Sequence, residues 1–549
     1  MSTPVLVAVA WPYASGSRHL GHVSGAYLPA DIFARHQRLV GNEVLMVSGS
    51  DVHGTPITVR ADDEGVTPQV IADRYHEEFL RQWEALGISW DNYTTTGTPH
   101  HARVTQEMFL QQLHNGHIDK RTSEQFFDPD VERFLPDRYI EGTCPHCSYD
   151  DARGDQCDQC GRTLDPIDLV DPRSKLSQAT PVLRKTEHFY FRYSDFTAEI
   201  GSYLAEKSDW RPHVLNFVRS WVDEEGLLDR AITRDLDWGV ELPVDDLGPG
   251  KRIYVWYDAV IGYLSASQEW ASNSADTDRW RHWWYNPDSR HVYFIGKDNI
   301  PFHCLFWPSQ LLGYDRDIHL PDDVPANQYV TFKGGKASAS RGIGLTIDQG
   351  LELFQVDGLR YALAASLPEQ ADTEISVEEI ARRINEELVA TWGNLVNRVL
   401  SMINKNFGEQ PPVDARTAED DAVLAAVDEA LASANDHIAR VELRAGLRAA
   451  MDAAQAVNAY LNATEPWKIV KDDRARGGVV LGTALDAING VRVAFAPYVP
   501  FSSAALDEVL GPVTAWERVP VPTGTAIAKP TPLFSKVDLD VLLADDSSR

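Results

Sequence analysis

Two short apolar runs near the start of the chain constrain its fold more than any other feature of the sequence. Residues 4–10 and 43–47 are apolar and rich in β-branched side chains, and residues 22–40 carry apolar positions at helical spacing before Gly41. Strands buried on both faces are continuously apolar, so this order predicts a strand, a helix and a second, parallel strand of an α/β sheet. The helix start carries no G-x-G-x-x-G, which removes the main support for a dinucleotide-dependent dehydrogenase.

The pattern changes twice further along the chain. Loops rich in Gly, Asp and Cys, with a short strand at 188–193, fill residues 115–235 before apolar runs at 252–257 and 291–295 predict further strands. Ala-rich helical patterns follow from residue 376, where Ser376 and Glu379 form a capping-box motif. We expect an α/β, Rossmann-like parallel-sheet domain that is split by an inserted lobe and followed by an all-α bundle. The expected divisions are residues 1–114, 115–235, 236–325, 326–375, 376–515 and a C-terminal arm, 516–549.

The charge balance limits the possible partners. The chain has 549 residues, with 81 acidic and 51 basic side chains, and a formal net charge of −30. This acidity excludes a basic nucleic-acid coat, so an RNA partner has to be bound by local basic patches within a Debye length of about 8 Å. No uninterrupted apolar run approaches the roughly 20 residues of a membrane span, and no basic residue precedes Arg18 as in a signal peptide. We expect a soluble, cytoplasmic protein without a membrane partner.

Four of the five cysteines lie within seventeen residues of one another. They form two C-x2-C pairs with nine residues between them: Cys144, Cys147, Cys157 and Cys160. Each pair can place two thiolates about 2.3 Å from a zinc ion, and this spacing is typical of a metal site and not of a disulfide framework. Four thiolates leave no open position on the metal, so we expect one structural Zn²⁺ per chain. The fifth cysteine, Cys304, is expected to be a core residue.

Polar residues follow the expected first and second strands. His19-Leu-Gly21-His22 lies where the first strand meets its helix, so the two histidines share a helix face above a phosphate-attracting N-terminus. Gly21 allows a ligand to approach the backbone. Asp51 follows the second strand, at the edge where α/β sheets bind ligands, and could hold an amino group. Read alone, the two histidines are equally consistent with ordinary surface residues.

A Gly/Ser-rich basic loop occurs far downstream. Residues 332–342 read Phe-Lys-Gly-Gly-Lys-Ala-Ser-Ala-Ser-Arg-Gly, a composition suited to wrapping phosphates. The same composition would also suit a linker.

These features together resemble the class I aminoacyl-tRNA synthetases, with His19 to His22 as the HIGH motif and Lys336 to Ser340 as the KMSKS motif. Finer blocks over about residues 4–500 resemble the methionyl-tRNA synthetase family. In chain order they are Trp11-Pro-Tyr13-Ala, Asp51-Val-His-Gly-Thr-Pro, Phe134-Leu-Pro-Asp-Arg, the four cysteines, Tyr254-Val-Trp256-Tyr-Asp258-Ala-Val-Ile-Gly-Tyr263 and Phe294-Ile-Gly-Lys-Asp298.

The resemblance implies a methionine–tRNA ligase. ATP, with Mg²⁺, and L-methionine would form methionyl-adenylate and pyrophosphate, and the methionyl group would pass to the 3′ adenosine of initiator and elongator methionine tRNAs. The methionine carboxylate would attack the α-phosphorus, a reaction accelerated mainly by positioning and charge stabilisation. The chain carries no large editing domain like those of the leucine, isoleucine and valine relatives, because its insertion spans only about 120 residues.

The resemblance also implies site residues. The catalytic residues would be His19, His22 and Lys336. The ATP site would add Gly21, Ser338 and Ser340. The methionine pocket would contain Trp11, Tyr13, Asp51, Trp256, Tyr263 and His303. The anticodon readers would be Asn394, Arg398 and Trp467, beside a basic cluster of Lys468, Lys471, Arg474 and Arg476. Without the resemblance to the family's blocks, each aromatic residue of this pocket would be interpreted as a core residue, and Trp467 as a packing residue.

Two positions depart from the family pattern, and two other functions remain open. Ala339 stands where the commonest motif has its second lysine, which leaves Lys333, Lys336 and Arg341 as candidates for the pyrophosphate contact. Gly25 replaces a larger residue of many relatives. The alternatives are a paralogue that adenylates methionine without charging tRNA, and a zinc-stabilised RNA-binding protein without catalysis. No further module follows residue 511, so a monomer is expected.

Overall fold

A parallel sheet forms the centre of the molecule. The structure is a computed structural model that describes residues 2–135, 139–157, 159–160, 162–224, 226–332, 335–336 and 344–539. The strands are β1 (Pro4–Val9), β2 (Glu43–Ser50), β3 (Asn92–Thr95), β15 (Arg290–Gly296) and β16 (Ala326–Asn327). Their order is β16-β15-β1-β2-β3, and every neighbouring pair is parallel. The strands predicted at 4–10, 43–47 and 291–295 are confirmed. The order reverses between β1 and β15, which is where such sheets bind ligands, at the carboxyl ends of the strands.

Helices cover both faces of the sheet, so its strands are apolar on both sides. They are α1 (Leu20–His22), η1 (Val23–Tyr27), α2 (Leu28–Leu39), α3 (Thr55–Glu64), α4 (Pro68–Leu86), α5 (Pro99–His114), α8 (Val255–Ser272), α9 (Arg281–Trp284), η5 (Lys297–Asn299), η6 (Phe302–Phe306) and α10 (Trp307–Tyr314). The first helix therefore runs from Leu20 to Leu39, as predicted, and Gly41 follows it with a φ of 86°.

The strand predicted at 252–257 is wrong. Only β14 (Lys251–Ile253) is extended, and it pairs with β13 (Thr233–Asp235). Tyr254 is the N-cap of α8, whose first eleven residues are nearly all buried. A helix that is apolar on all sides has the same short apolar run as a buried strand, so periodicity alone could not separate the two.

Two helices of the α/β domain contain a π segment. In η1 the Leu28 N–H donates to the Val23 carbonyl, and in η6 the Trp307 N–H donates to the Phe302 carbonyl, five residues back in each case. Each segment is followed after one residue by a proline, Pro29 or Pro308. Proline has no N–H, so each helix lacks one backbone donor just beyond its widened turn.

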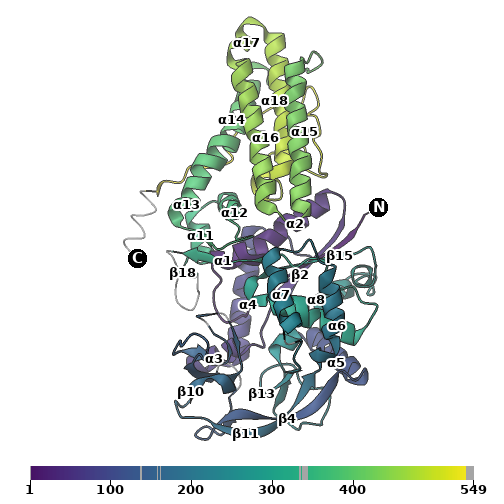
Figure 1. The fold of residues 1–549 in the computed structure, drawn as a ribbon. Helices are drawn as coiled ribbons and strands as arrows, with labels where there is room; N and C mark the ends of the chain where they lie inside the picture. The colour runs from purple at the N-terminus through teal and green to yellow at the C-terminus, as the bar shows by residue number, and fades with distance from the viewer. Residues whose placement is uncertain are drawn as a thin grey trace.

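The inserted lobe contains antiparallel sheets, and β4, β10 and β11 lie at the end of the molecule opposite α17 (Figure 1). Its main sheet has the order β12-β11-β4-β5, and β10-β6-β7 and β8-β9 form smaller sheets. The elements are β4 (Ile118–Asp128), β5 (Arg133–Phe134), β6 (Ile140–Thr143), β7 (Ala152–Arg153), β8 (Asp155–Gln156), β9 (Thr163–Leu164), η3 (Pro166–Asp168), β10 (Val170–Ser174), β11 (Val182–Phe191), η4 (Tyr193–Phe196), α6 (Thr197–Ala205), α7 (Pro212–Glu224) and β12 (Arg230–Ala231). The strand predicted at 188–193 begins earlier and ends at Phe191.

The all-α bundle is also confirmed. A linking region contains β17 (Val330–Phe332), β18 (Gly335–Lys336), α11 (Ile347–Leu353), α12 (Val356–Ala365) and β19 (Thr373–Glu374). The bundle contains α13 (Val377–Arg382), η8 (Arg383–Gly393), α14 (Asn394–Asn406), α15 (Ala418–Ala439), α16 (Leu443–Thr464), α17 (Pro466–Asp472), α18 (Arg474–Phe495), α19 (Pro500–Ala504) and α20 (Asp507–Leu510). Ser376 caps α13 by accepting from the Glu379 N–H. In the described part of the chain, α18 alone is long and apolar enough to span a membrane, and its 18-residue apolar window is wholly buried in the bundle.

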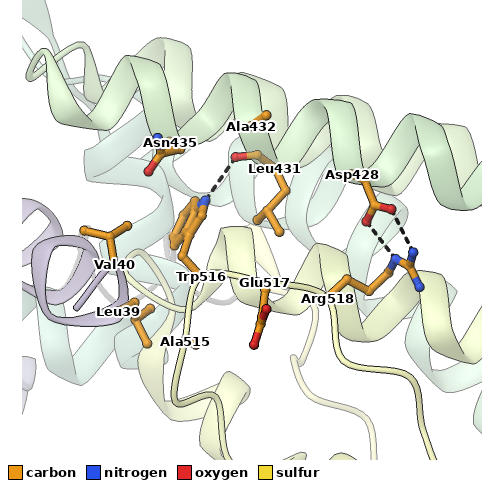
Figure 2. Close-up of a pocket in the computed structure, with 10 residues that line it drawn as sticks. All are labelled: Leu39, Val40, Asp428, Leu431, Ala432, Asn435, Ala515, Trp516, Glu517 and Arg518. Carbon is orange, nitrogen blue, oxygen red and sulfur yellow. Dashed lines mark hydrogen bonds and ion pairs between the residues drawn. The ribbon is translucent and has the colours of Figure 1, made fainter. Parts of the chain in front are cut away.

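The C-terminal arm runs back along the bundle. The Val521 N–H donates to Asp486 at 2.7 Å, and Asn489 donates to the Val519 carbonyl at 2.7 Å. Figure 2 shows where the arm passes the end of α2: the Trp516 indole donates to the Leu431 carbonyl, and Arg518 pairs with Asp428 at 2.7 Å. These residues border an open cleft of about 670 Å³ between the arm, α2 and α15.

One guanidinium connects the α/β domain to the bundle. Arg360 of α12 donates to Asp31 of α2 at 2.6 Å, to the Leu86 carbonyl at 2.9 Å and to the carbonyls of Pro497 and Tyr498 at 3.0 Å. Neither Arg360 nor Asp31 is exposed to solvent. Burial would raise the pKa of Asp31, but the nearby arginines lower it, so the pair is ionised.

We expect Arg360→Met to lower the free energy of unfolding by about 3–5 kcal/mol, because Asp31 and the carbonyls would stay buried without their donor. The control is Arg81→Met, which breaks an ion pair with Asp348 whose side chains are 60% and 38% exposed. That loss should stay under about 1 kcal/mol. Chemical and thermal unfolding of both variants measures the difference, and equal losses would show that the buried pair contributes no more than a surface one.

Candidate functional site

The site lies beyond the carboxyl ends of β1 and β2. After the strands end, the two segments stay paired: the Asp51 N–H donates to the Pro12 carbonyl and the Ala14 N–H donates to the Asp51 carbonyl, both at 2.9 Å. Tyr13 and Asp51 form an isolated parallel bridge as a result. The two predicted residues, far apart in the sequence, therefore enter the site side by side.

Three glycines make room for two of the predicted aromatic rings. A Cβ atom added to Gly49 or Gly262 would lie 2.2 or 2.7 Å from the Trp11 ring, and one added to Gly54 would lie 2.2 Å from the Tyr13 ring. Real Cβ atoms never come so close, so these positions must lack a side chain for the rings to occupy their places.

The other pocket residues come from α8 and η6. The Tyr263 hydroxyl and His303 Nε2 are 2.6 Å apart, and His303 Nδ1 lies 2.9 Å from the Asn299 carbonyl. A carbonyl only accepts, so Nδ1 carries the proton and Nε2 accepts from Tyr263. Burial lowers the pKa of His303 to about 4, which keeps the ring neutral at pH 7.

Ring contacts join these residues in two groups. Trp11 lies 6.4 Å from Tyr263, and Tyr13 lies 5.9 Å from Trp256, measured between ring centroids. Trp256 stacks on Phe302 at 3.9 Å. The structure thus brings together all six residues predicted for the methionine pocket.

A buried charge network lies beside Asp51. Asp258 contacts His53 Nδ1 at 2.6 Å and His101 Nε2 at 2.8 Å. Burial opposes its ionisation, but the two histidines outweigh burial and lower the pKa of Asp258 to about 2. Asp51 is in the opposite situation. Burial, and then the charge of Asp258, raise its pKa well above the ordinary value, and they outweigh the hydrogen bond from the His53 N–H, which lowers it.

The predicted phosphate-facing histidines lie together at the start of the first helix. The His19 and His22 rings are 3.9 Å apart, and the His19 N–H donates to His22 Nδ1 at 3.3 Å. Arg18 lies 3.3 Å from His22 Nε2, which adds a positive charge to this face. Gly21 is partly exposed between the histidines.

One end of the basic loop lies beside this helix start. Lys336 is in β18, where its backbone pairs with Thr331. On the other side of the loop, the Leu345 carbonyl accepts from the Leu20 N–H at 3.0 Å, and Thr346 bridges His19. The remaining loop positions discussed above lie outside the described residues: Lys333, Ser338, Ala339, Ser340 and Arg341.

The four paired cysteines form a cluster suited to a metal ion. The sulfur atoms of Cys144 and Cys160 are 4.0 Å apart, those of Cys147 and Cys157 are 3.7 Å apart, and all four lie within 4.8 Å of one another. A disulfide would bring sulfurs to about 2.05 Å. Four thiolates around a tetrahedral ion at about 2.3 Å would be separated by about 3.8 Å. The cluster matches the second geometry.

The predicted anticodon residues lie on the bundle. Asn394 is exposed at the start of α14, and Arg398, one turn later, donates to Asn458 of α16 at 2.9 Å. Trp467 is 38% exposed in α17, at the end of the bundle farthest from the sheet (Figure 1). The predicted basic cluster is smaller than expected, because Arg476 pairs with Asp420 and Arg474 donates to the Asn406 carbonyl.

Sequence reasoning missed the roles of His53, His101 and Asp258. Two of them lie within quoted blocks, but nothing in the sequence indicates that three residues from separate segments meet in one buried network. His101 follows the Pro99 helix start like any surface histidine. Only the packing of α5 against α8 shows the contact.

Comparisons with known proteins agree with this geometry. Residues 5–400 match the family described as tRNA synthetases class I (M), and residues 411–543 match the anticodon binding domain of methionyl tRNA ligase. The methionine–tRNA ligase of Roseiflexus sp. (strain RS-1) is 46% identical over 588 residues, covering 100% of this chain and 99% of that protein. That of Dehalococcoides mccartyi (strain CBDB1) is 47% identical over 566 residues, covering 100% of both chains.

Among solved structures, Mycobacterium tuberculosis methionyl-tRNA synthetase in complex with methionyl-adenylate matches with a TM-score of 0.80 at 27% identity. The match covers 97% of this chain and 100% of that one. Fold and site therefore define a class I aminoacyl-tRNA synthetase. Within that class the chain belongs to the methionine–tRNA ligase family. These relatives favour the ligase over both alternatives. The protein activates methionine with ATP and transfers it to methionine tRNA.

We expect Asp51→Asn to stabilise the free protein at neutral pH. An acid whose pKa is higher in the folded state binds more protons folded than unfolded, so stability falls as pH rises above the ordinary value of 3.8. Removing the carboxyl group removes that loss. The midpoint of thermal unfolding should therefore exceed that of the unchanged protein at about pH 7.5, and the gain should shrink towards about pH 4.

Asp258→Asn is the matched control, because the pKa of Asp258 is lowered to about 2. Its ionised form stabilises the fold above an ordinary aspartate pKa, and that contribution is lost as pH falls through about 2. This variant should lower the midpoint at about pH 7.5. A lower midpoint for Asp51→Asn as well would contradict the raised pKa of Asp51.

Proposed function

We propose that methionine binds with its ammonium group on Asp51 and its side chain among Trp11, Tyr13, Trp256, Tyr263 and His303. The observation that carries this proposal is that residues after β1 and β2 meet residues of α8 and η6. Together they place one carboxylate beside a set of aromatic rings. Sulfur–aromatic contacts contribute about 0.3–1.5 kcal/mol each, so such a set of rings suits a thioether. The bound ammonium would supply the positive charge that buried Asp51 otherwise lacks.

The first chemical step joins methionine to AMP. A methionine carboxylate oxygen attacks the α-phosphorus of ATP, and the bond from that phosphorus to the bridging oxygen breaks, so pyrophosphate leaves with the electron pair. His19 and His22 contact the phosphates beside Gly21. Lys336, with Ser338 and Ser340, neutralises the departing pyrophosphate, and Mg²⁺ accompanies ATP. The backbone contacts of Leu345 and Thr346 with the start of the first helix support this, because they hold one end of the loop beside His19.

The second step transfers methionine to tRNA. A hydroxyl of the terminal adenosine attacks the methionyl carbonyl, and AMP leaves. Asn394, Arg398 and Trp467 read the anticodon of initiator and elongator tRNAs, since an exposed indole can stack an unpaired base and an amide or guanidinium can bond its edge. The protein acts as a cytoplasmic monomer without a membrane partner. Its working divisions are residues 1–114, 115–235, 236–325, 326–375, 376–515 and 516–549.

The cysteine cluster binds one structural Zn²⁺ in this proposal. The sulfur separations of 3.7 and 4.0 Å suit tetrahedral thiolate ligands, and a set of four cysteines favours zinc among the common metal ions. Cys144 and Cys157 are buried among Leu135, Tyr139 and Ile140, so the ion would close the small core of the inserted lobe.

Methionine-dependent exchange of pyrophosphate into ATP tests the pocket. Asp51→Asn keeps the shape of the side chain but removes its charge, so the KM for methionine should rise by about 100-fold or more, with little change in the KM for ATP. The same variant is expected to be more heat-stable than the parent, which separates loss of binding from loss of folding. An unchanged KM for methionine would refute the assigned ammonium site.

We expect one zinc per chain in protein purified without chelator. Replacing Cys144 and Cys160 together by serine should remove the metal and lower the thermal stability of the inserted lobe, because structural zinc contributes directly to folding. Metal analysis by mass spectrometry measures the stoichiometry. Cys304→Ser is the matched control and should keep its zinc; a metal content near zero in the parent would contradict the site.

Trp467→Ala should lower the charging of methionine tRNA by about 10- to 100-fold, the equivalent of about 1–3 kcal/mol of lost stacking. Exchange of pyrophosphate should stay unchanged, because α17 lies at the far end of the bundle. Trp516→Ala, which removes an indole that packs against α15, is the comparison. Equal losses in both activities for Trp467→Ala would favour a packing role for this residue.

A further inference from the structure

The helix that carries His19 and His22 has two carbonyl groups without their usual donors. In an α-helix the Gly25 carbonyl would accept from residue 29, but Pro29 has no N–H. The Ser24 carbonyl would accept from Leu28, but the Leu28 N–H donates to Val23 in the π segment. Ser24 is buried and Gly25 is partly buried beside the sheet, where a carbonyl without a donor is unfavourable.

One side chain from the sheet supplies the missing donor. Asn327, at the end of β16, places Nδ2 at 2.9 Å from the Gly25 carbonyl and 3.4 Å from the Ser24 carbonyl. The amide is 1% exposed. Its orientation is determined by Arg211, whose Nη1 lies 2.7 Å from Asn327 Oδ1. Since arginine only donates, the amide oxygen has to face Arg211 and the amide nitrogen has to face the helix.

We propose that Asn327, oriented by Arg211, is a positioning residue for adenylate formation. It connects the carboxyl end of β16 to the π segment that begins at the residue after His22, so it determines where the histidines stand above the sheet. This inference rests on the proposed contact of His19 and His22 with ATP. Neither Asn327 nor Arg211 touches a reacting atom in this proposal.

The pair also connects the helix to two other parts of the chain. Arg211 belongs to the inserted lobe, just before α7, and donates to the Ala326 carbonyl at 2.9 Å. Its second nitrogen lies 3.5 Å from the carbonyl of Val441, in the turn between α15 and α16 of the bundle. The lobe, the sheet edge and the base of the bundle therefore all meet at the residue that orients Asn327.

Two substitutions of Asn327 separate hydrogen bonding from packing. Asn327→Asp keeps the shape and can still accept from Arg211, but a carboxylate has no proton to donate to Gly25 or Ser24. Asn327→Ala removes both interactions. We expect each to lower kcat for methionine-dependent pyrophosphate exchange by about 10- to 100-fold, as a displacement of about 1 Å at a reacting group does. The KM for methionine should change less than threefold.

Pro29→Ala provides a rescue that a merely structural role would not give. The new alanine N–H can donate to the Gly25 carbonyl, so the helix no longer needs Asn327 for that bond. Asn327→Ala should therefore cost much less in the Pro29→Ala background than in the parent, by a factor of at least about five in kcat. Independent, multiplied losses in the double variant would overturn the proposal.

Two controls make the outcomes distinct. His213→Ala removes another contact to the Ala326 carbonyl, at 3.0 Å, without touching the helix, and should leave exchange unchanged. His22→Ala tests the proposed ATP contact itself. Loss of activity in His22→Ala with normal kcat in both Asn327 variants would refute the positioning role alone. Normal activity in His22→Ala would refute the proposed ATP contact instead.

Discussion

The Arg360 guanidinium is the interaction on which the relative position of the two main parts depends. It reaches α2, the end of α4 and the end of α18 at once, and its charge is balanced within the core by Asp31. Asp31 in turn accepts from Ser89 and Arg35. A single residue of the linking region therefore fixes α2 against the base of the bundle. Elsewhere on α2, the C-terminal arm and Trp516 contact its end and α15 (Figure 2).

The site combines groups that stabilise the fold with groups that oppose it. Asp258 is ionised and held by two histidines, and it makes the ionisation of Asp51 harder. A protein under selection for stability alone would not keep a second buried carboxylate beside the first. Natural proteins accept such conflicts where a ligand resolves them, and the ammonium group proposed to bind Asp51 would supply the opposite charge.

Much of this architecture could be predicted from the sequence, because periodicity and caps are local signals. The parallel strands, the first helix and the final bundle follow from apolar spacing and from Gly41 and Ser376 as stop and start residues. The apolar run at 252–257 was misread because a fully buried helix and a buried strand share the same composition. The cysteine spacing predicted a cluster, and the structure brings its four sulfur atoms together.

The buried networks could not be predicted in the same way. His101 and Asp258 lie 157 residues apart, and Arg211 and Asn327 lie 116 apart, so only the packed fold reveals their contact. The proposed pocket residues were inferred from the block resemblance, since an isolated Trp or Tyr is more often a core residue. The geometry then adds what the blocks lack: three glycines that admit the rings, and a tyrosine that orients His303.

The paired π segments have a consequence for how this enzyme can tolerate insertions and deletions. Each segment contains one residue more than the α-helical turn it replaces, and the first directly follows His22 while the second contains His303. An α-helix turns about 100° per residue. Losing one residue from either segment would restore a regular helix but rotate His22 or His303 away from the sheet edge. The number of residues in each π segment is therefore fixed. Homologous chains should differ there by substitutions and not by insertions or deletions.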